Sequence, residues 1–327
     1  MNKFRILQIC ILGLSSSISY AIPITGTFDA TKACPAYVSK NKQTNPGDIF
    51  ITPTKTYQIE EINKAPNPDW FRINISNAPE SSLRWVNESC GIAHLNGDPK
   101  SCKQEPGLAD SYVLALSWQP AFCDTYGYQK GKYECEHLPA DSSQAQNFSL
   151  HGLWPNQKAC GTNYGFCSNV KKQSNFCNYA PLNLDQQTST VLHQVMPGYN
   201  ESSCLERHEW NKHGTCQLLN KNAYYNQAAN FVNEVNQSEL EKLIKNNIGK
   251  SITIEQFNKV FDQSFGQQTH QKVYINCKND ELVDVYINLP TLNTIDNQNL
   301  KALLPLAPNA KQSSCPQTFK ISNFSHN

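Results

Sequence analysis

Apolar and polar positions change their spacing about a third of the way along this 327-residue chain. Before that point the runs are short and alternate between apolar and polar residues, as strands with one buried face do. Beyond about Pro106 the patterns lengthen, beginning with the continuous apolar run Tyr112–Trp118, which is typical of a buried strand. In a chain of this length the change indicates two domains, at residues 22–105 and 106–327.

The first domain is expected to be small and rich in β-structure. Turn residues at Asn45-Pro46-Gly47 and Pro66-Asn67-Pro68 separate its alternating runs. The last two runs resemble a bacterial SH3-like barrel, and Cys34 and Cys90 bracket the strands in a way that would let them form a disulfide. Such a module binds a wall polymer, a peptide or the catalytic domain, or is a structural appendage, and the sequence does not identify its ligand. The predicted strands are Phe50–Thr52, Thr56–Ile59, Trp70–Ile75 and Leu83–Val86.

Helical spacing appears only in the second domain. Residues Asn183–Met196 place Leu184, Val191, Leu192 and Val195 on one face, and Pro197-Gly198 ends the pattern. Helices and strands then come in blocks without regular alternation, which favours an α+β fold. The further helices are expected at Ala223–Val235, Glu239–Asn247 and Ile254–Phe265, and the further strands at Lys272–Cys277 and Leu282–Leu289.

The N-terminus is typical of a signal peptide. Lys3 and Arg5 precede a short apolar run, and Ser19-Tyr20-Ala21 resembles a cleavage site, so we expect residues 1–21 to be removed. A buried N-terminal strand is the alternative. The apolar run is too short to span a membrane, and no later segment reaches about 20 apolar residues. The protein is therefore expected to be secreted or periplasmic, with no membrane span.

Cysteine content agrees with export. Of the 13 cysteines, Cys10 lies in the signal peptide, and the even number left implies a disulfide framework in an oxidising compartment. Loss of Lys3 and Arg5 also lowers the formal net charge from +1 to −1, because 26 basic residues then face 27 acidic ones. A polyanion would thus be held by local charge, as at Lys130/Lys132, Lys171/Lys172 and Lys212, although such pairs are also ordinary on a solvated surface.

The segment His208-Glu209-Trp210-Asn211-Lys212-His213-Gly214-Thr215-Cys216 has the densest chemistry in the chain. A zinc-binding helix needs histidines at i and i+4, about 40° apart, whereas His208 and His213 stand at i and i+5, about 140° apart. In a helix Lys212 and Glu209 fall between them on the same arc. This arrangement favours proton transfer and charge stabilisation at an anionic centre over a metal site. For Glu209 and Lys212 alone, the alternative is an ordinary surface ion pair.

A second cluster, Ser149-Leu150-His151-Gly152-Leu153-Trp154-Pro155, contains another candidate histidine. Alone, His151 is more typical of a core residue. Together, His-Gly-Leu-Trp-Pro and His-Glu-Trp-Asn-Lys-His-Gly-Thr-Cys resemble the ribonuclease T2 family. Residues Val113–Cys123 resemble the family's first strand, and Met196-Pro197-Gly198 with Ser203–Arg207 resembles the bacterial periplasmic ribonuclease I branch. The resemblance covers about residues 109–327 and implies a central antiparallel sheet with packed helices.

The resemblance implies a monomeric endoribonuclease that needs no cofactor and no metal. It would cleave single-stranded RNA with low base specificity by transphosphorylation, through 2′,3′-cyclic phosphate ends. His213 would be the general base and His151 the general acid, because an imidazole with a pKa of about 6.5 serves both purposes. His208 would hold the phosphate and Lys212 would neutralise charge on it. Glu209 would lie beside Lys212, and its spacing also allows it to orient His213.

The resemblance also suggests residues for base recognition and pairs of cysteines for disulfides, but less directly than it suggests the catalytic residues. Trp154 either stacks on a base or packs in the core. Asn156 stands where many relatives carry an aspartate that reads the base, so base preference does not transfer. Gln119 and Tyr164 are further candidates for base contact. The expected disulfides are Cys216 with Cys167 or Cys177, Cys277 with Cys315, and Cys123 with Cys135.

Two other classes of protein remain compatible with parts of the sequence. One is a binding or signalling protein in which the N-terminal module is the working part. Its scaffold would have no need of His151, His208, Glu209, Lys212 and His213 together. The other is a metalloenzyme that uses His208 and His213, which the i, i+5 spacing disfavours.

Overall fold

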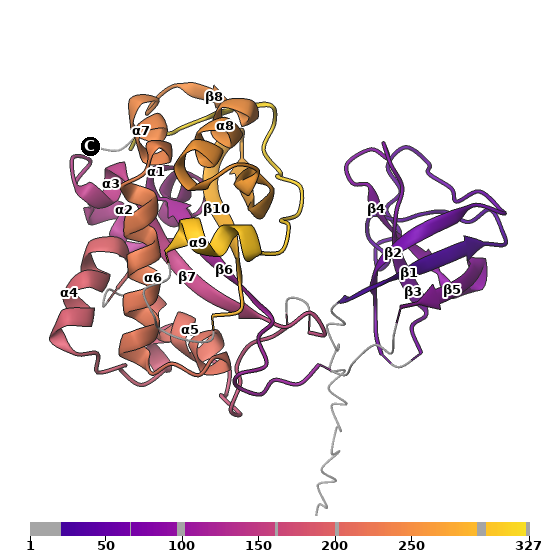
Figure 1. The fold of residues 1–327 in the computed structure, drawn as a ribbon, viewed down its shortest axis with the longest axis horizontal. Helices are drawn as coiled ribbons and strands as arrows, with labels where there is room; N and C mark the ends of the chain where they lie inside the picture. The colour runs from indigo at the N-terminus through magenta and orange to yellow at the C-terminus, as the bar shows by residue number, and fades with distance from the viewer. Residues whose placement is uncertain are drawn as a thin grey trace, which may run out of the picture. The chain divides into compact units, whose positions relative to one another are not determined.

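The computed structural model describes residues 21–65, 67–96, 102–160, 163–199, 203–292 and 299–324. All of the predicted signal peptide except Ala21 lies outside these residues, as does Pro66. The chain divides into two compact units, one within residues 1–100 and one from residue 101 onward. Each unit is described by itself (Figure 1). In the described parts of both, no helix is long and apolar enough to cross a membrane.

The first unit is a sheet in the order β4-β3-β2-β1-β5, with every pair of neighbours antiparallel. A short 3-10 turn, Glu88–Cys90, joins β4 to β5, and the disulfide Cys34–Cys90 ties this turn to the loop after β1. Apolar side chains from alternate positions, including Phe28, Ile59 and Ile73, form the core. The strands are β1 (Ile22–Ala30), β2 (Thr56–Ile62), β3 (Trp70–Asn74), β4 (Leu83–Asn87) and β5 (Gly91–Leu95).

The predicted strand at residues 50–52 is wrong. Only Phe50 pairs there, through an isolated bridge to Pro35, and the next two residues are irregular. Three β-favouring residues stand together there and predict a strand, but Phe50 is 54% exposed and packs against no sheet. The sequence pattern did not predict β1, an inner strand interrupted by Gly26, or the edge strand β5, which begins at Gly91.

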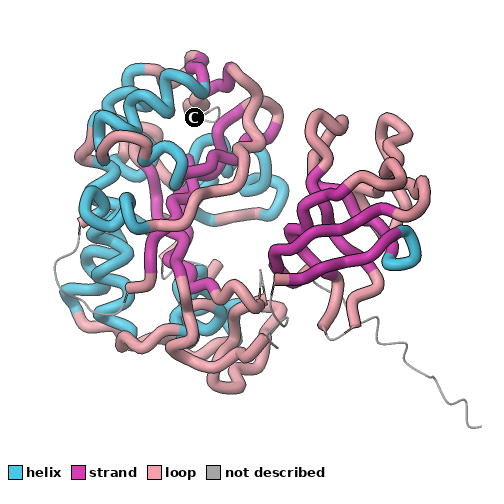
Figure 2. The backbone as a smooth tube through the Cα atoms, turned by 45° about the vertical axis from the view of Figure 1, so that its right-hand side comes forward, coloured by secondary structure: helices cyan, strands magenta, loops and turns pink. Residues whose placement is uncertain are grey.

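The second unit is built on a six-stranded sheet in the order β7-β6-β10-β11-β8, with β9 paired to β10. All pairs are antiparallel except β10 with β11. This sheet and its helices give the α+β fold expected from the pattern (Figure 2). The strands are β6 (Ser111–Trp118), β7 (Phe148–Asn156), β8 (Ser251–Thr253), β9 (Val273–Lys278), β10 (Glu281–Pro290) and β11 (Thr318–Lys320).

Helices cover one face of this sheet and bury its apolar side chains. Helix α6 (Lys221–Asn236) lies along β6 and β7, and its Phe231 and Val232 pack in one core with Leu114 and Leu153 (Figure 1). The predicted helix at residues 254–265 forms with those bounds as α8, because Thr253 and Gln256 make a capping box and Gly266 follows. The other helices are α1 (Gln119–Phe122), α2 (Tyr133–His137), α3 (Ser143–Gln146), α4 (Gln186–Val195), α5 (Leu205–Lys212), α7 (Glu239–Asn246) and α9 (Leu300–Leu303).

Six disulfides join the described cysteines. Cys123–Cys135 and Cys277–Cys315 are pairs expected from the sequence, and Cys216 pairs with Cys167, one of its two expected partners. Cys177 pairs instead with Cys204, directly before α5. Cys102–Cys160 ties the start of the second unit to the loop after β7.

Candidate active site

Helix α5 carries three of the site's ionisable side chains and ends immediately before the fourth. His208, Glu209 and Lys212 lie within the helix, whereas His213 is its C-cap, with φ −110° and ψ −50°. The amide of His213 still donates to the carbonyl of Glu209 at 2.9 Å. The next residue leaves no room for a side chain, since a Cβ on Gly214 would lie 2.3 Å from the Trp210 ring. The chain then tightens into a 3-10 turn at Gly214–Cys216.

Strand β7 brings His151 to this helix end. His151 Nε2 lies 3.9 Å from Glu209 Oε1, and the two side chains are 37% and 1% exposed. The approach depends on Gly152, because a Cβ there would stand 2.1 Å from Glu209 Oε2 and 2.4 Å from Trp154 Nε1. The strand and the helix therefore meet at a buried carboxylate, with one histidine at the rim.

Trp154 fills the space between the two histidines. Its Nε1 donates to Glu209 Oε2 at 2.7 Å. Its ring stacks on His213, with centroids 5.2 Å apart and planes at 22°, and meets the ring of His151 edge-on at 5.2 Å. The two interpretations offered by the sequence were base stacking and core packing. Trp154 is only partly buried and packs against the candidate catalytic side chains themselves.

Glu209 does not hydrogen-bond to His213, the residue that its i, i+4 spacing would allow it to orient. The carboxylate accepts from Trp154, and among the described residues no side-chain bond joins it to His213 and no ion pair joins it to Lys212. An i, i+4 contact requires both residues to lie in regular helix, and His213 is already at the cap. Burial raises the pKa of Glu209, while the charge of His151 and the bond from Trp154 oppose that rise.

His208 is enclosed by two phenylalanines. Phe176 stacks on its ring, with centroids 3.9 Å apart and planes at 16°, and Phe166 meets it edge-on at 6.4 Å. Burial, followed by the charge of Lys212, lowers the pKa of His208 to about 4. The pKa of His213 also lies well below its ordinary value, mainly because the ring is buried and then because Lys212 is close. Both rings are therefore neutral at neutral pH.

Two disulfides hold these phenylalanines in place. Phe176 precedes Cys177, which is bonded to Cys204 at the N-terminal end of α5. Phe166 precedes Cys167, which is bonded to Cys216 beyond the other end. The amide of Phe166 also donates to the carbonyl of Lys212 at 2.8 Å. Helix α5 is thus fastened at both ends to the loops that cover His208.

A cavity of about 190 Å³ opens beside His151. Gln119, one of the predicted base-contacting residues, lies in its wall and is 4% exposed. Ser149 donates to Gln119 Oε1 at 3.3 Å. Phe176 and Lys132 line the same cavity, so the cover of His208 is also a wall of this space.

Comparison with known proteins identifies the family of this second unit. The model of the ribonuclease T2 family matches residues 109–303, which is more than half of the chain. The chain belongs to the ribonuclease T2 family. It is therefore a ribonuclease T2-type endoribonuclease, an enzyme that acts on RNA.

Two curated relatives and one solved structure illustrate the similarity. Ribonuclease I of Escherichia coli (strain K12) is 28% identical over 233 residues, covering 66% of this chain and 87% of the relative. This match supports the predicted ribonuclease I branch. Intracellular ribonuclease LX of Solanum lycopersicum is 25% identical over 189 residues, covering 54% and 72%. The crystal structure of Actibind, a T2 ribonuclease, has a TM-score of 0.45 at 15% identity and covers 69% of this chain and 93% of its own.

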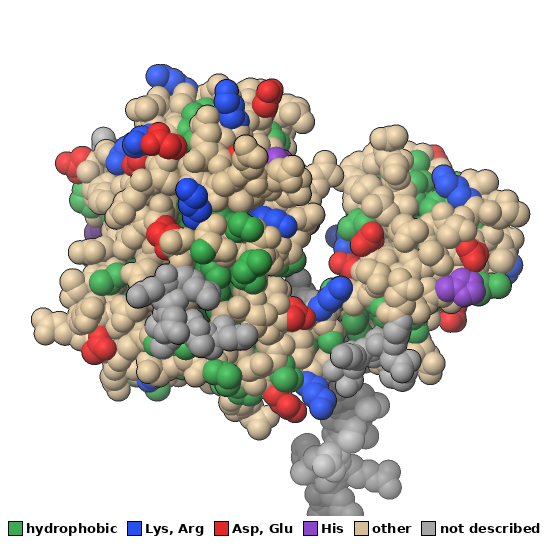
Figure 3. Space-filling model, in the orientation of Figure 1, with side chains coloured by type: hydrophobic (Ala, Val, Ile, Leu, Met, Phe, Trp, Pro, Cys, Tyr) green, Lys and Arg blue, Asp and Glu red, His purple; other side chains and the backbone are tan. Residues whose placement is uncertain are grey.

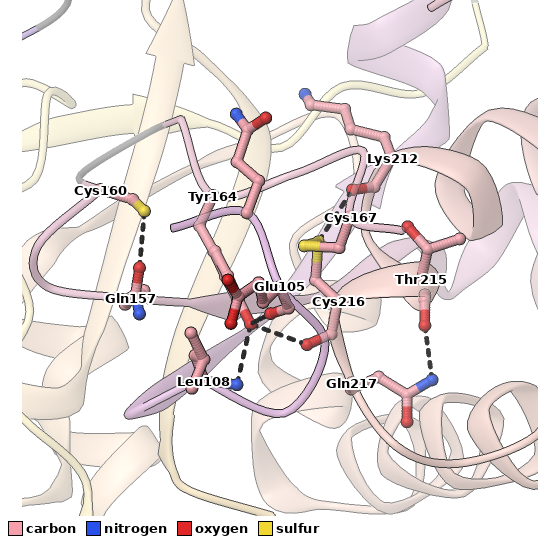
Figure 4. The surroundings of a disulfide bond; sticks show 12 residues. Glu105, Leu108, Gln157, Cys160, Tyr164, Cys167, Lys212, Thr215, Cys216 and Gln217 are labelled. Carbon is pink, nitrogen blue, oxygen red and sulfur yellow. Dashed lines mark hydrogen bonds between the residues drawn. A yellow bond between two sulfur atoms is a disulfide. The ribbon is translucent and has the colours of Figure 1, made fainter. Parts of the chain in front are cut away.

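Tyr164 of this ribonuclease T2 chain is not available to stack on a base. It is 3% exposed, and its hydroxyl lies 2.7 Å from the carbonyl of Glu105 and 2.9 Å from that of Cys216 (Figure 4). The hydroxyl also accepts from the amide of Leu108 at 3.0 Å. The ring packs beside the disulfide Cys167–Cys216. The expectation failed because a buried tyrosine that joins three chain segments has no local sequence pattern.

Asn156 lies apart from His151. It ends β7, pairs with Ser111 of β6, and accepts from the amide of Asp110 through its carbonyl. Five residues along a strand span about 16 Å, and Asn156 does not line the cavity beside His151. Its part in base recognition stays a prediction.

Cations gather locally around the site of this family member. The charges of Lys212, Lys172 and Lys132 each lower the pKa of His208, after burial. On the visible face of the second unit, by contrast, Lys and Arg side chains are interspersed with Asp and Glu (Figure 3). The sequence had offered these lysines as candidates, but it gave no sign that Phe166 and Phe176 would cover His208. The only available signal was that each phenylalanine directly precedes a cysteine.

Proposed function

We propose that this enzyme is an exported endoribonuclease that cleaves single-stranded RNA by metal-independent transphosphorylation, with low base specificity. One observation carries the proposal. Two histidines flank Trp154 and Glu209 in opposite environments, His213 buried with a lowered pKa and His151 partly exposed beside a carboxylate. Environments that differ in this way suit a neutral base and a charged acid at the same pH.

In the proposed reaction His213 takes the proton of the ribose 2′-hydroxyl. The 2′-oxygen then forms a bond to phosphorus, and the bond from phosphorus to the 5′-oxygen breaks. His151 gives a proton to that departing oxygen, and a 2′,3′-cyclic phosphate remains. Hydrolysis of the cyclic ester reverses the two roles, with water in place of the leaving alcohol. Proton transfers between these two histidines and the substrate balance every step.

The remaining polar side chains stabilise charge. We assign Lys212 to the non-bridging oxygens, where its ammonium group offsets the negative charge that grows in the transition state. His208, whose ring is neutral, would donate one N–H to the same phosphate. Glu209 would orient His151, in agreement with their separation of 3.9 Å. Gln119 and Trp154 would contact bases without selecting strongly among them.

The first unit, predicted as residues 22–105, is assigned as an SH3-like domain, and the second, predicted as residues 106–327, as the catalytic domain. The disulfide Cys102–Cys160 attaches residue 102 to the second unit. The strand order β4-β3-β2-β1-β5, with a 3-10 turn between its last two strands, supports this assignment. Six disulfides support export through the predicted signal peptide to the periplasm or beyond, because such bonds persist in oxidising compartments. We expect a monomer.

One assay tests the proposal. An RNA oligonucleotide and the DNA of the same sequence are incubated with the enzyme in EDTA, and the product ends are identified by mass spectrometry. We expect RNA cleavage to cyclic phosphate ends and no DNA cleavage, because DNA lacks the 2′-nucleophile. His151→Ala and His213→Ala should each abolish nearly all turnover. Intact RNA at both acidic and neutral pH, with correctly bonded cysteines, would show that the proposal is wrong.

A further inference from the structure

The ring of His213 lacks the contact that usually orients a catalytic histidine. In such sites one ring nitrogen ordinarily bonds to a carboxylate or carbonyl, which sets the tautomer and the ring plane. His213 Nδ1 is buried and has no hydrogen-bond partner among the described residues. The ring is instead stacked on Trp154 at 5.2 Å. Its orientation therefore depends on what holds Trp154.

Trp154 is held at its edge and on its other side. At the edge of the indole, Nε1 donates a hydrogen bond to Glu209 Oε2. Tyr286 of β10 packs against the indole, with centroids 5.7 Å apart and planes at 40°. Tyr274 of β9 stacks on Tyr286 in turn at 4.7 Å and 20°, and Lys311 Nζ lies 4.5 Å from the centroid of Tyr274. His213, Trp154, Tyr286 and Tyr274 thus form one row of rings, which we call the aromatic row.

The sheet register makes this row possible. Gly152, Ala115, Tyr286 and Tyr274 are paired in one line across β7, β6, β10 and β9. The two positions nearest the catalytic helix carry a hydrogen atom and a methyl group. Because they are so small, the Trp154 side chain reaches over β6 to meet Tyr286. A larger residue at either position would separate the two rings.

We propose that Tyr286 is a positioning residue for the general base: through Trp154 it fixes the ring of His213 against the scissile ribose. This inference rests on the proposed function, in which His213 removes the 2′-proton. Tyr286 touches neither His213 nor the reacting atoms. Aromatic pairs of this kind add stabilisation beyond the area that they bury, so loss of the Tyr286 ring frees Trp154 to tilt. A base misplaced by about 1 Å loses on the order of 100-fold in rate.

Steady-state kinetics of Tyr286→Leu test the inference. We expect kcat to fall about 10- to 100-fold, with KM changed by less than about twofold, because substrate contacts are intact. Tyr286→Phe keeps the ring and should restore kcat to within about threefold of wild type. Tyr274→Leu removes the next ring of the aromatic row and should lower kcat in the same direction by less.

The dependence of kcat/KM on pH provides a second readout, which a general loss of stability would not shift. Burial is the main cause of the low pKa of His213, so a loosened Trp154 should raise that pKa toward 6.5. The base must be neutral, and the acidic limb should therefore shift to higher pH in Tyr286→Leu. The titratable groups that face His213 are Lys212 and His208 on α5 and His151 on β7, and Asp284 faces Tyr286. All four remain in the variant.

A matched control separates positioning from stability. Phe265→Leu removes a ring from the core of α8, on the helix-covered side of the sheet, and should lower the melting temperature while leaving kcat unchanged. An unchanged kcat in Tyr286→Leu, an equal fall in both variants, or a rise in KM alone would overturn the inference. If His213→Ala stays active in the same assay, the proposed function fails instead. If His213→Ala is inactive and Tyr286→Leu behaves as wild type, only this inference fails.

Discussion

Replacement of Trp154 by Phe tests how the buried carboxylate of Glu209 is stabilised. The substitution removes the indole N–H that donates to Glu209 Oε2 at 2.7 Å. The Glu209 side chain, which is 1% exposed, then lacks that hydrogen bond. A hydrogen bond to a charged group contributes about 1.5–3 kcal/mol. For a unit of this size each kcal/mol corresponds to about 2–4 °C in melting temperature, so we expect a decrease of about 3–12 °C at neutral pH.

The loss should depend on pH. Burial raises the pKa of Glu209 in the folded protein above its ordinary value of 4.5, so folding favours the protonated acid. The Trp154 bond opposes this by favouring the carboxylate, and its removal raises that pKa further. The destabilisation by Trp154→Phe is therefore fully present above the folded pKa and shrinks as the pH falls through it. Loss of packing adds a part that does not change with pH.

Urea unfolding at about pH 8 and at about pH 4 measures both parts. The matched control is the same substitution in a Glu209→Gln background, where no charge is buried. There Trp154→Phe should cost about 1 kcal/mol at either pH, as for a neutral hydrogen bond. Equal destabilisation at the two pH values, or an equal cost in both backgrounds, would refute the description of Glu209 as a buried carboxylate held by Trp154.

Other substitutions test the remaining parts of the site. His208→Ala should mainly raise KM, because His208 is assigned to phosphate binding; a fall in kcat alone would show that the assignment is wrong. The kcat/KM profile should be bell-shaped with its maximum on the acidic side, because the lowered pKa of His213 keeps the base neutral below pH 6.5; a maximum above neutral pH would contradict this. Tyr164→Phe leaves the Leu108 amide and nearby carbonyls without their partner, so it should cost about 1–3 kcal/mol in unfolding free energy. Relative rates on RNAs of different base composition should stay the same, since a buried tyrosine contacts no base.

Elements with strong local signals could be predicted from the sequence. Helix α8 has a capping box before it and a glycine after it, and its bounds were predicted without error. The continuous apolar run at Tyr112–Trp118 forms β6, which lies between β7 and β10. Strands β1 and β5 were missed because their pairing is with distant segments and their patterns contain glycine. Pairing energy between strands depends on neighbours that the local sequence does not name.

The candidate site could be predicted only as far as its motifs extend. His151 and α5 meet as the two motifs implied, at Glu209. The partner of Glu209 was not predictable, because it depends on the helix ending at Lys212 and on Gly152 leaving space for Trp154. The phenylalanines that cover His208 come from loops. Tyr286, which supports Trp154, comes from β10, a strand more than a hundred residues after β7. Such contacts follow from tertiary packing and from disulfides, and neither has a local period.

The most direct test of the catalytic account uses a DNA oligonucleotide that contains a single ribonucleotide. In EDTA, the enzyme should cut only at the phosphate 3′ to that ribose and leave a 2′,3′-cyclic phosphate on it, since only there does a 2′-hydroxyl adjoin phosphorus. His213→Ala should leave the oligonucleotide intact. Cleavage elsewhere in the strand, or a first product that ends in a 5′-phosphate, would contradict attack by the 2′-oxygen and with it the assigned roles of His213 and His151.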